Sequence, residues 1–151
     1  MKPLLVGAVS VLLFACGGSS APLSEAFAGT WMTNRDVSAG SLGSAQGEGA
    51  GTELDIAVVG SSASVSKPCL DGTGALTFTG SGDSASYSGL EACAPTAFGS
   101  CGSVVVSYAT GTASVSLGPE IGLTVTLKGN VSGCGQSSAL TATFTGITPD
   151  L

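Results

Sequence analysis

The amino-acid sequence predicts an all-β domain, a small antiparallel β-barrel or β-sandwich of about eight or nine short strands. Three observations support this fold class. Only 9% of the residues are charged whereas 24 are glycine, a composition that fits short strands and tight turns better than a disordered chain. Apolar residues alternate with Ser and Thr, which is typical of antiparallel strands with one buried face. Glycine-containing turn signals separate the alternating segments.

The first 15 residues have the pattern of a cleavable signal helix. A short positive region, Met1-Lys2, precedes the apolar run 4–14, which is shorter than the ~20 residues of a membrane-spanning helix. At the end of this segment, Leu13-Phe14-Ala15-Cys16 resembles the lipobox of bacterial lipoproteins. The resemblance implies that residues 1–15 are removed and that Cys16 becomes the mature N-terminus. Ordinary secretory cleavage near Ala15, leaving Cys16 as a free thiol, is the alternative.

The lipobox resemblance also implies a partner and a location. Cys16 would carry a diacylglycerol and an acyl chain, and several chains together anchor a protein stably in a lipid bilayer. Gly17 stands where an Asp often marks inner-membrane retention in this family, so the outer membrane of the cell envelope is favoured. Residues 16–26 are expected to form the lipidated N-terminus and a flexible tether, since 17–22 are small or polar. Residues 27–151 are expected to form one domain.

Period-two alternation marks each expected strand of this domain. The clearest segment is 121–128, in which four apolar residues alternate with Gly, Thr and Lys. The other apolar phases are Leu54/Ile56/Val58, Ala63/Val65, Leu76/Phe78, Ala85/Tyr87, Val104/Val106/Tyr108, Ala113/Val115/Leu117 and Leu140/Ala142/Phe144. Hairpin turns are expected at Gly60, Gly80–Gly82, Thr110–Gly111 and Gly118–Pro119.

The four cysteines other than Cys16 are expected to form two disulfides, because an exported chain folds in an oxidising compartment. They are Cys69, Cys93, Cys101 and Cys134. Zinc binding is disfavoured, since the sequence has no CxxC spacing and no histidine. Three pairings are possible; Cys93 with Cys101 is the natural local pair across a short loop, which leaves Cys69 with Cys134.

This pairing conflicts with the simplest topology. In an unbroken meander of the expected strands, Cys134 falls at the end of the domain opposite to the other three cysteines. Two explanations remain open: one strand is miscounted, or one connection crosses over as in a Greek key. The segment 90–102 is long enough for such a crossover.

The composition disfavours several functional classes. The net charge is −6 with no cluster of basic residues, so a nucleic-acid partner is not expected. Without histidine, a Ser-His-Asp or Cys-His arrangement cannot form. Lys67 and Lys128 remain as candidate bases, but Lys67 starts a loop and Lys128 lies on the solvent-facing phase of its strand, so neither is expected to be buried. No catalytic residue, metal ligand or cofactor is therefore predicted.

One further motif suggests a family. Phe27-Ala28-Gly29-Thr30-Trp31 resembles the F-x-G-x-W opening of lipocalin-like barrels, in which the Trp plugs one end of the barrel. The match covers the first strand only. Trp31 is thus the one named candidate for ligand contact, although a core position is favoured for a residue of this size.

These features together predict a non-enzymatic, membrane-tethered envelope protein with a binding or structural role. Its expected partners are the lipid bilayer, through acylated Cys16, and either a small apolar ligand or another envelope protein; the oligomeric state stays open. A lipocalin-like carrier of a small apolar ligand is the main alternative. A hydrolase that uses two of the ten carboxylates comes third.

Overall fold

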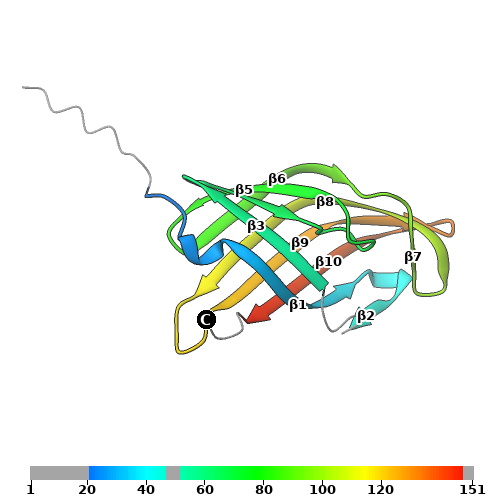
Figure 1. The fold of residues 1–151 in the computed structure, drawn as a ribbon. Helices are drawn as coiled ribbons and strands as arrows, with labels where there is room; N and C mark the ends of the chain where they lie inside the picture. Colours follow the sequence, from blue (N-terminus) through cyan, green and yellow to red (C-terminus); the bar gives the residue numbers. More distant parts are fainter. Residues whose placement is uncertain (1–20, 47–51, 148–151) are drawn as a thin grey trace, which may run out of the picture.

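The structure, a computed structural model, describes residues 21–46 and 52–147 (Figure 1). The expected signal helix, Cys16 and residues 17–20 of the tether lie outside these residues. The elements are η1 (Glu25–Phe27), β1 (Gly29–Ser38), η2 (Gly40–Leu42), β2 (Ser44–Gln46), β3 (Thr52–Val59), β4 (Ser62–Ser66), β5 (Ala75–Ser81), β6 (Ser84–Ala92), β7 (Thr96–Phe98), β8 (Cys101–Ser116), β9 (Gly122–Gly133) and β10 (Gln136–Ile147).

Eight of these strands form a closed antiparallel barrel, which confirms the predicted all-β class. The order around the barrel is β1, β3, β4, β5, β6, β8, β9 and β10. Pairing of residues 33–38 of β1 with residues 141–146 of β10 closes it. The short strands β2 and β7 add to β1 and β8. Because barrel neighbours are also neighbours along the chain, the topology is a meander without a crossover.

The two ends of the barrel are formed by different loops and short elements (Figure 1). At the N-terminal end, the segment 21–28 is hydrogen-bonded to the turns at Gly60 and Gly82. The loop 117–121 lies at the same end. At the disulfide end lie η2, β2, the loop 67–74, the segment 93–100 and the turn between β9 and β10.

The expected turn at Thr110–Gly111 is wrong, because these residues lie inside β8. The pairing register shifts between Tyr108 and Thr110, and this bulge moves the inward phase from even to odd residues. The resulting break in alternation imitates the end of one strand and the start of another. The strands are accordingly longer than expected, with 16 residues in β8 and 12 each in β9 and β10. Leu117, expected to point inward, is 61% exposed in the loop after β8.

Two glycines lie next to this bulge, Gly111 in β8 and Gly129 in β9, and a side chain at either position would crowd its neighbours. A Cβ atom on Gly129 would lie 1.9 Å from the carbonyl oxygen of Ser107, a backbone clash that no side-chain movement relieves. A Cβ atom on Gly111 would lie 2.7 Å from Cδ2 of Leu127 and 3.2 Å from the ring of Phe78. These glycines let β8 and β9 approach each other and leave room for the core side chains.

The expected disulfide pairing is also wrong: Cys69 bonds to Cys93, and Cys101 bonds to Cys134. The amide N–H of Cys93 donates to the carbonyl of Val106, five residues along β8 from Cys101. At about 3.3 Å per residue, that separation far exceeds the reach of a disulfide. The miscounted strand explains the earlier conflict, since with β8 as one strand all four cysteines lie at the disulfide end.

The folded domain starts before residue 27, so the expected tether is too long. Leu23 is 3% exposed and Phe27 is fully buried. The amide N–H groups of Leu23 and Ser24 donate to the carbonyls of Gly60 and Gly82, and the N–H of Gly82 donates to the carbonyl of Pro22. Residues 22–26 therefore belong to the barrel.

Candidate functional site

The interior of the barrel is filled by large side chains. The bulkiest of those with less than 2% exposure are Trp31, Tyr108, Phe27, Phe78 and Phe144. Trp31, the candidate for ligand contact, is 1% exposed, and its indole N–H donates to the carbonyl of Phe27 at 2.9 Å. Trp31 therefore packs at the N-terminal end of the core, with its polar atom bonded within the protein.

Two polar side chains of the barrel wall hold the loop 67–74 at the disulfide end. Arg35 lies on the inward phase of β1, and its guanidinium donates to the carbonyl of Leu70 at 3.1 Å. The hydroxyl of Tyr108 donates to the carbonyl of Pro68 at 3.1 Å, and burial raises the pKa of Tyr108 to about 12. Together with the Cys69–Cys93 disulfide, these bonds fix the loop.

The second disulfide at this end ties β8 to the turn after β9. Its Cα atoms are 5.9 Å apart, and those of the Cys69–Cys93 pair are 5.7 Å apart. The disulfide end is therefore a set of connections cross-linked to the barrel strands. Such loops on a rigid scaffold are the usual location of binding residues.

The structure brings Glu53, Asp55 and Lys67 together on the outer surface of β3. The ammonium of Lys67 pairs with Glu53 and lies 2.9 Å from the carboxylate of Asp55. The hydroxyl of Thr30 donates to the same carboxylate of Asp55 at 2.8 Å. These hydrogen bonds, first from Lys67 and then from Thr30, lower the pKa of Asp55. Glu53 and then Asp55 raise the pKa of Lys67, so its amine stays protonated at neutral pH.

We expect the carboxyl of Asp55 to titrate below its ordinary pKa of 3.8. A lowered folded-state pKa means that the ion pair stabilises the protein above pH 3.8, and that this contribution disappears as the pH falls through the folded-state value. In Lys67→Met, the pKa of Asp55 should rise toward 3.8, as measured by NMR titration of carboxyl carbons. Lys128→Met is the matched control, and an unchanged Asp55 pKa in Lys67→Met would contradict the assignment of its cause.

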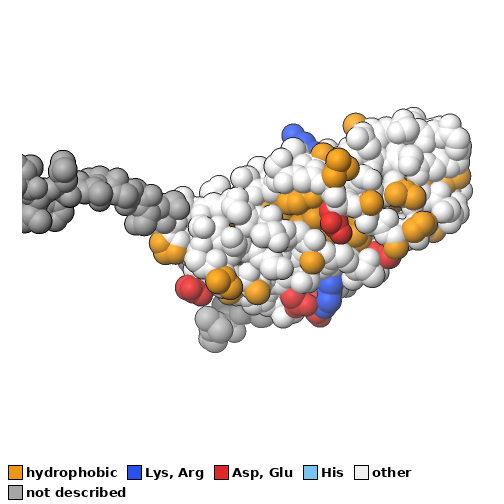
Figure 2. Space-filling model, turned by 90° about the horizontal axis from the view of Figure 1, so that it is seen from above, with side chains coloured by type: hydrophobic (Ala, Val, Ile, Leu, Met, Phe, Trp, Pro, Cys, Tyr) orange, Lys and Arg blue, Asp and Glu red, His pale blue; other side chains and the backbone are white. Residues whose placement is uncertain are grey.

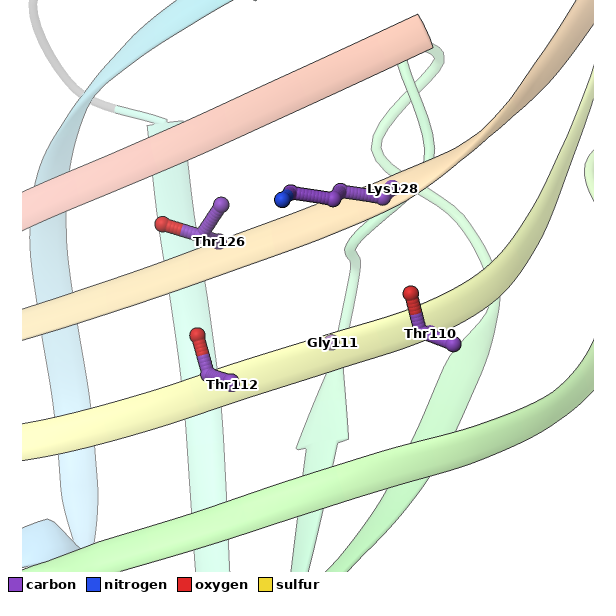
Figure 3. A pocket seen from close by; sticks show the side chains of 5 residues that line it. All are labelled: Thr110, Gly111, Thr112, Thr126 and Lys128. Atoms are coloured by element: carbon purple, nitrogen blue, oxygen red, sulfur yellow. The ribbon is translucent and has the colours of Figure 1, made fainter. Parts of the chain in front are cut away.

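Hydroxyl side chains cover the outer wall over β8, β9 and β10. Thr112 of β8 pairs with Thr126 of β9, which in turn pairs with Thr143 of β10. A shallow groove of about 230 Å³ lies on this wall, and Figure 3 shows the side chain of Lys128 extending along β9 toward Thr126. The groove is lined by Thr110, Gly111, Thr112, Thr126 and Lys128. Its hydroxyl groups and single ammonium suit a polar or anionic ligand better than an apolar one.

A second groove, of about 330 Å³, lies where β1, β2 and β10 meet. It is lined by Asp36, Val37, Ser38, Ser44, Thr141 and Thr143. The charged group in this groove is the carboxylate of Asp36, whereas the first groove has the ammonium of Lys128. Most of the other lining residues again carry hydroxyl groups. Both grooves open outward and neither enters the barrel core.

Neither a metal centre nor a membrane-spanning helix is found in the described part of the chain. Within residues 21–46 and 52–147, no three His, Cys, Asp or Glu side chains form a group that could hold a metal ion. No helix there is long and apolar enough to cross a membrane. Comparisons with protein-family models, with curated proteins and with solved structures find no match to this chain.

Two features were not predicted from the sequence pattern. One is the inward position of Arg35, and the other is the alignment of Thr residues from separate strands on the outer wall of the barrel. Arg35 lies between Thr33 and Val37 on the buried phase of β1, so the spacing in 31–37 could have signalled it. The Thr rows depend on the pairing register of three strands. Alternation predicts which face a residue occupies, but it does not say which residue lies opposite.

Proposed function

We propose that the chain is the precursor of a lipid-anchored protein of the bacterial cell envelope, with a binding or structural role and no catalytic activity. The observation that carries the proposal is the lipobox-like sequence ending at Cys16, only six residues before Pro22, where the barrel domain begins. With so short a spacer, an acylated Cys16 would hold the barrel close to the bilayer. The cross-linked disulfide end would then face away from the membrane and be free to contact partners.

The ionisable groups support a non-enzymatic role. Glu53 and Asp55 are the carboxylates that share a contact with Lys67, but a general acid needs a raised pKa, and the pKa of Asp55 is lowered. Lys67 is held in its protonated form and cannot serve as a base at neutral pH. This cluster has the chemistry of a surface ion pair.

The carrier alternative requires space inside the barrel. The inward side chains of Trp31, Phe78, Tyr108 and Phe144 are buried against one another in one core cluster. The described grooves lie on the outer wall and are lined mainly by hydroxyl groups. These features favour a closed core, and an interior apolar ligand would have to displace aromatic side chains that are at most 1% exposed.

Processing at Cys16 tests the proposal. Intact-mass measurement of the membrane-extracted protein should show that residues 1–15 are missing and that acyl chains are attached to Cys16. Cys16→Ser should remain unprocessed or be released without acyl chains, whereas Ser20→Ala, a control in the same segment, should be processed as the wild type. Recovery from wild-type cells of an unacylated chain that begins at or after Cys16 would overturn the lipoprotein proposal.

A further inference from the structure

Three of the six exposed large apolar side chains of the described residues lie at the N-terminal end of the barrel. Val59 is the last residue of β3, Leu117 follows β8, and Ile147 is the last residue of β10; their exposed fractions are 79%, 61% and 58%. Ser116 and Ile147 both pair with Gly122, so Leu117 and Ile147 flank the start of β9. Val59 adjoins Gly60, to which the N-terminal segment is bonded. We call Val59, Leu117 and Ile147 the apolar rim.

The charged side chains at this end limit the kind of lipid surface that the apolar rim could contact. Glu25, Asp83 and Glu120 are exposed in η1, in the turn after β5 and in the loop after β8. The described cations lie elsewhere, since Arg35 and Lys67 are near the disulfide end and Lys128 is in the middle of β9. In Figure 2, orange and red side chains lie beside the grey N-terminal atoms, and others are spread along the rest of this face. An apolar rim with acidic neighbours suits a zwitterionic surface and is repelled by an anionic one.

The short segment between Cys16 and the barrel indicates which surface the apolar rim would contact. Four residues separate Cys16 from Ala21, the first described residue, which makes five Cα–Cα steps. At no more than about 3.6 Å per residue, they span at most about 18 Å. Acyl chains on Cys16 would therefore keep Ala21 within about that distance of the bilayer, and they would make contact between this end of the barrel and lipid an intramolecular event.

We propose that the apolar rim of Val59, Leu117 and Ile147 docks onto the zwitterionic lipid surface, so that the barrel stands on the membrane with its disulfide end outward. This inference rests on the proposed lipid anchoring at Cys16 and adds to it a defined orientation. The acyl chains supply attachment, while the rim supplies a contact between a defined part of the barrel and the lipid surface.

Two tryptophan reporters test the orientation in the full mature, acylated protein. Leu117→Trp places an indole in the rim, and Leu90→Trp places one at the opposite end, where Leu90 is 84% exposed. Trp31, the only native tryptophan, is buried and common to both variants. In phosphatidylcholine vesicles with brominated acyl chains, the introduced tryptophan at 117 should lose most of its emission, and the one at 90 should lose none.

Further variants separate the two proposals. Adding Val59→Ser and Ile147→Ser to Leu117→Trp should abolish the quenching, while the protein still floats with the vesicles through its acyl chains. Replacing phosphatidylcholine by phosphatidylglycerol should also reduce the quenching. Circular dichroism and the emission of Trp31 check that each variant is folded.

The outcomes that overturn the rim proposal are specific. Equal quenching at positions 117 and 90 in protein that floats with vesicles would reject docking but leave lipid anchoring intact. Stronger quenching in phosphatidylglycerol would also reject the proposal. A concentration-dependent blue shift at position 117 without vesicles, with dimers in sedimentation, would assign the rim to a second copy of the chain. Protein that lacks acyl chains and does not float would instead reject the anchoring itself.

Discussion

Removal of either disulfide should lower the free energy of unfolding by about 3–4 kcal/mol. The cross-links close segments with sequence separations of 24 and 33 residues, and the chain-entropy model gives this magnitude for loops of that size. The paired variants Cys69→Ala/Cys93→Ala and Cys101→Ala/Cys134→Ala should each melt about 10–20 °C below the wild type, measured by circular dichroism. The second loop is longer, so its loss should cost slightly more.

The same variants test the pairing by titration of free thiols after denaturation. Each paired variant should have no free thiol among the two remaining domain cysteines, because their native bond is kept. Cys69→Ala/Cys101→Ala, which removes one partner from each bond, is the matched control and should leave Cys93 and Cys134 without their native partners. A peptide map of the wild type in which Cys93 is linked to Cys101 would contradict the structure. Paired variants with the same melting temperature as the wild type would contradict the predicted loss of stability.

Trp31→Ala should destabilise the domain by about 3–5 kcal/mol, the range for a large aromatic side chain removed from a core. The indole is 1% exposed, and its N–H is bonded to the carbonyl of Phe27 in η1. The substitution leaves a cavity and an unpaired carbonyl beneath the segment that closes the N-terminal end. Urea unfolding followed by far-UV circular dichroism measures the effect without depending on tryptophan emission.

Two matched variants show which property of Trp31 matters. Trp31→Phe keeps an aromatic ring but loses the hydrogen bond, and it should cost less than Trp31→Ala. Met32→Ala, at a neighbouring position that is 51% exposed, should change stability by no more than about 0.5 kcal/mol. A Trp31→Ala protein as stable as the wild type would show that this residue is not part of the core, and would reopen the prediction of ligand contact.

Most of the barrel strands could be predicted from alternation alone. The segments 54–58, 63–65, 76–78 and 140–144 each fall within an observed strand with the predicted residues facing inward. This success has a simple cause, because a strand in a closed barrel has one buried face along its whole length. The turns at Gly60 and Gly118–Pro119 were predicted because Gly and Pro interrupt the alternation where the chain reverses. The turn expected at Gly80–Gly82 begins slightly later, since β5 runs to Ser81.

The candidate sites were less predictable. Trp31 was favoured as a core residue, and its burial agrees with that preference. The contact of Lys67 with Glu53 and Asp55 joins the end of β4 to β3, and the Thr-lined groove joins β8 to β9. Neither follows from spacing along the chain, because the contacting residues are brought together only when strands pair in a particular register.

The sequence by itself determined the all-β class, the inward faces of most strands and the presence of four domain cysteines, because these depend on local alternation and composition. Only the tertiary structure decided that Tyr108 and Gly111 belong to one strand, since a bulge shifts the side-chain phase without ending the pairing to Gly129. That single strand places all four cysteines at one end and sets the pairs Cys69–Cys93 and Cys101–Cys134. Disulfide partners are fixed by distance in the folded barrel, and distance along the chain carries little of that information.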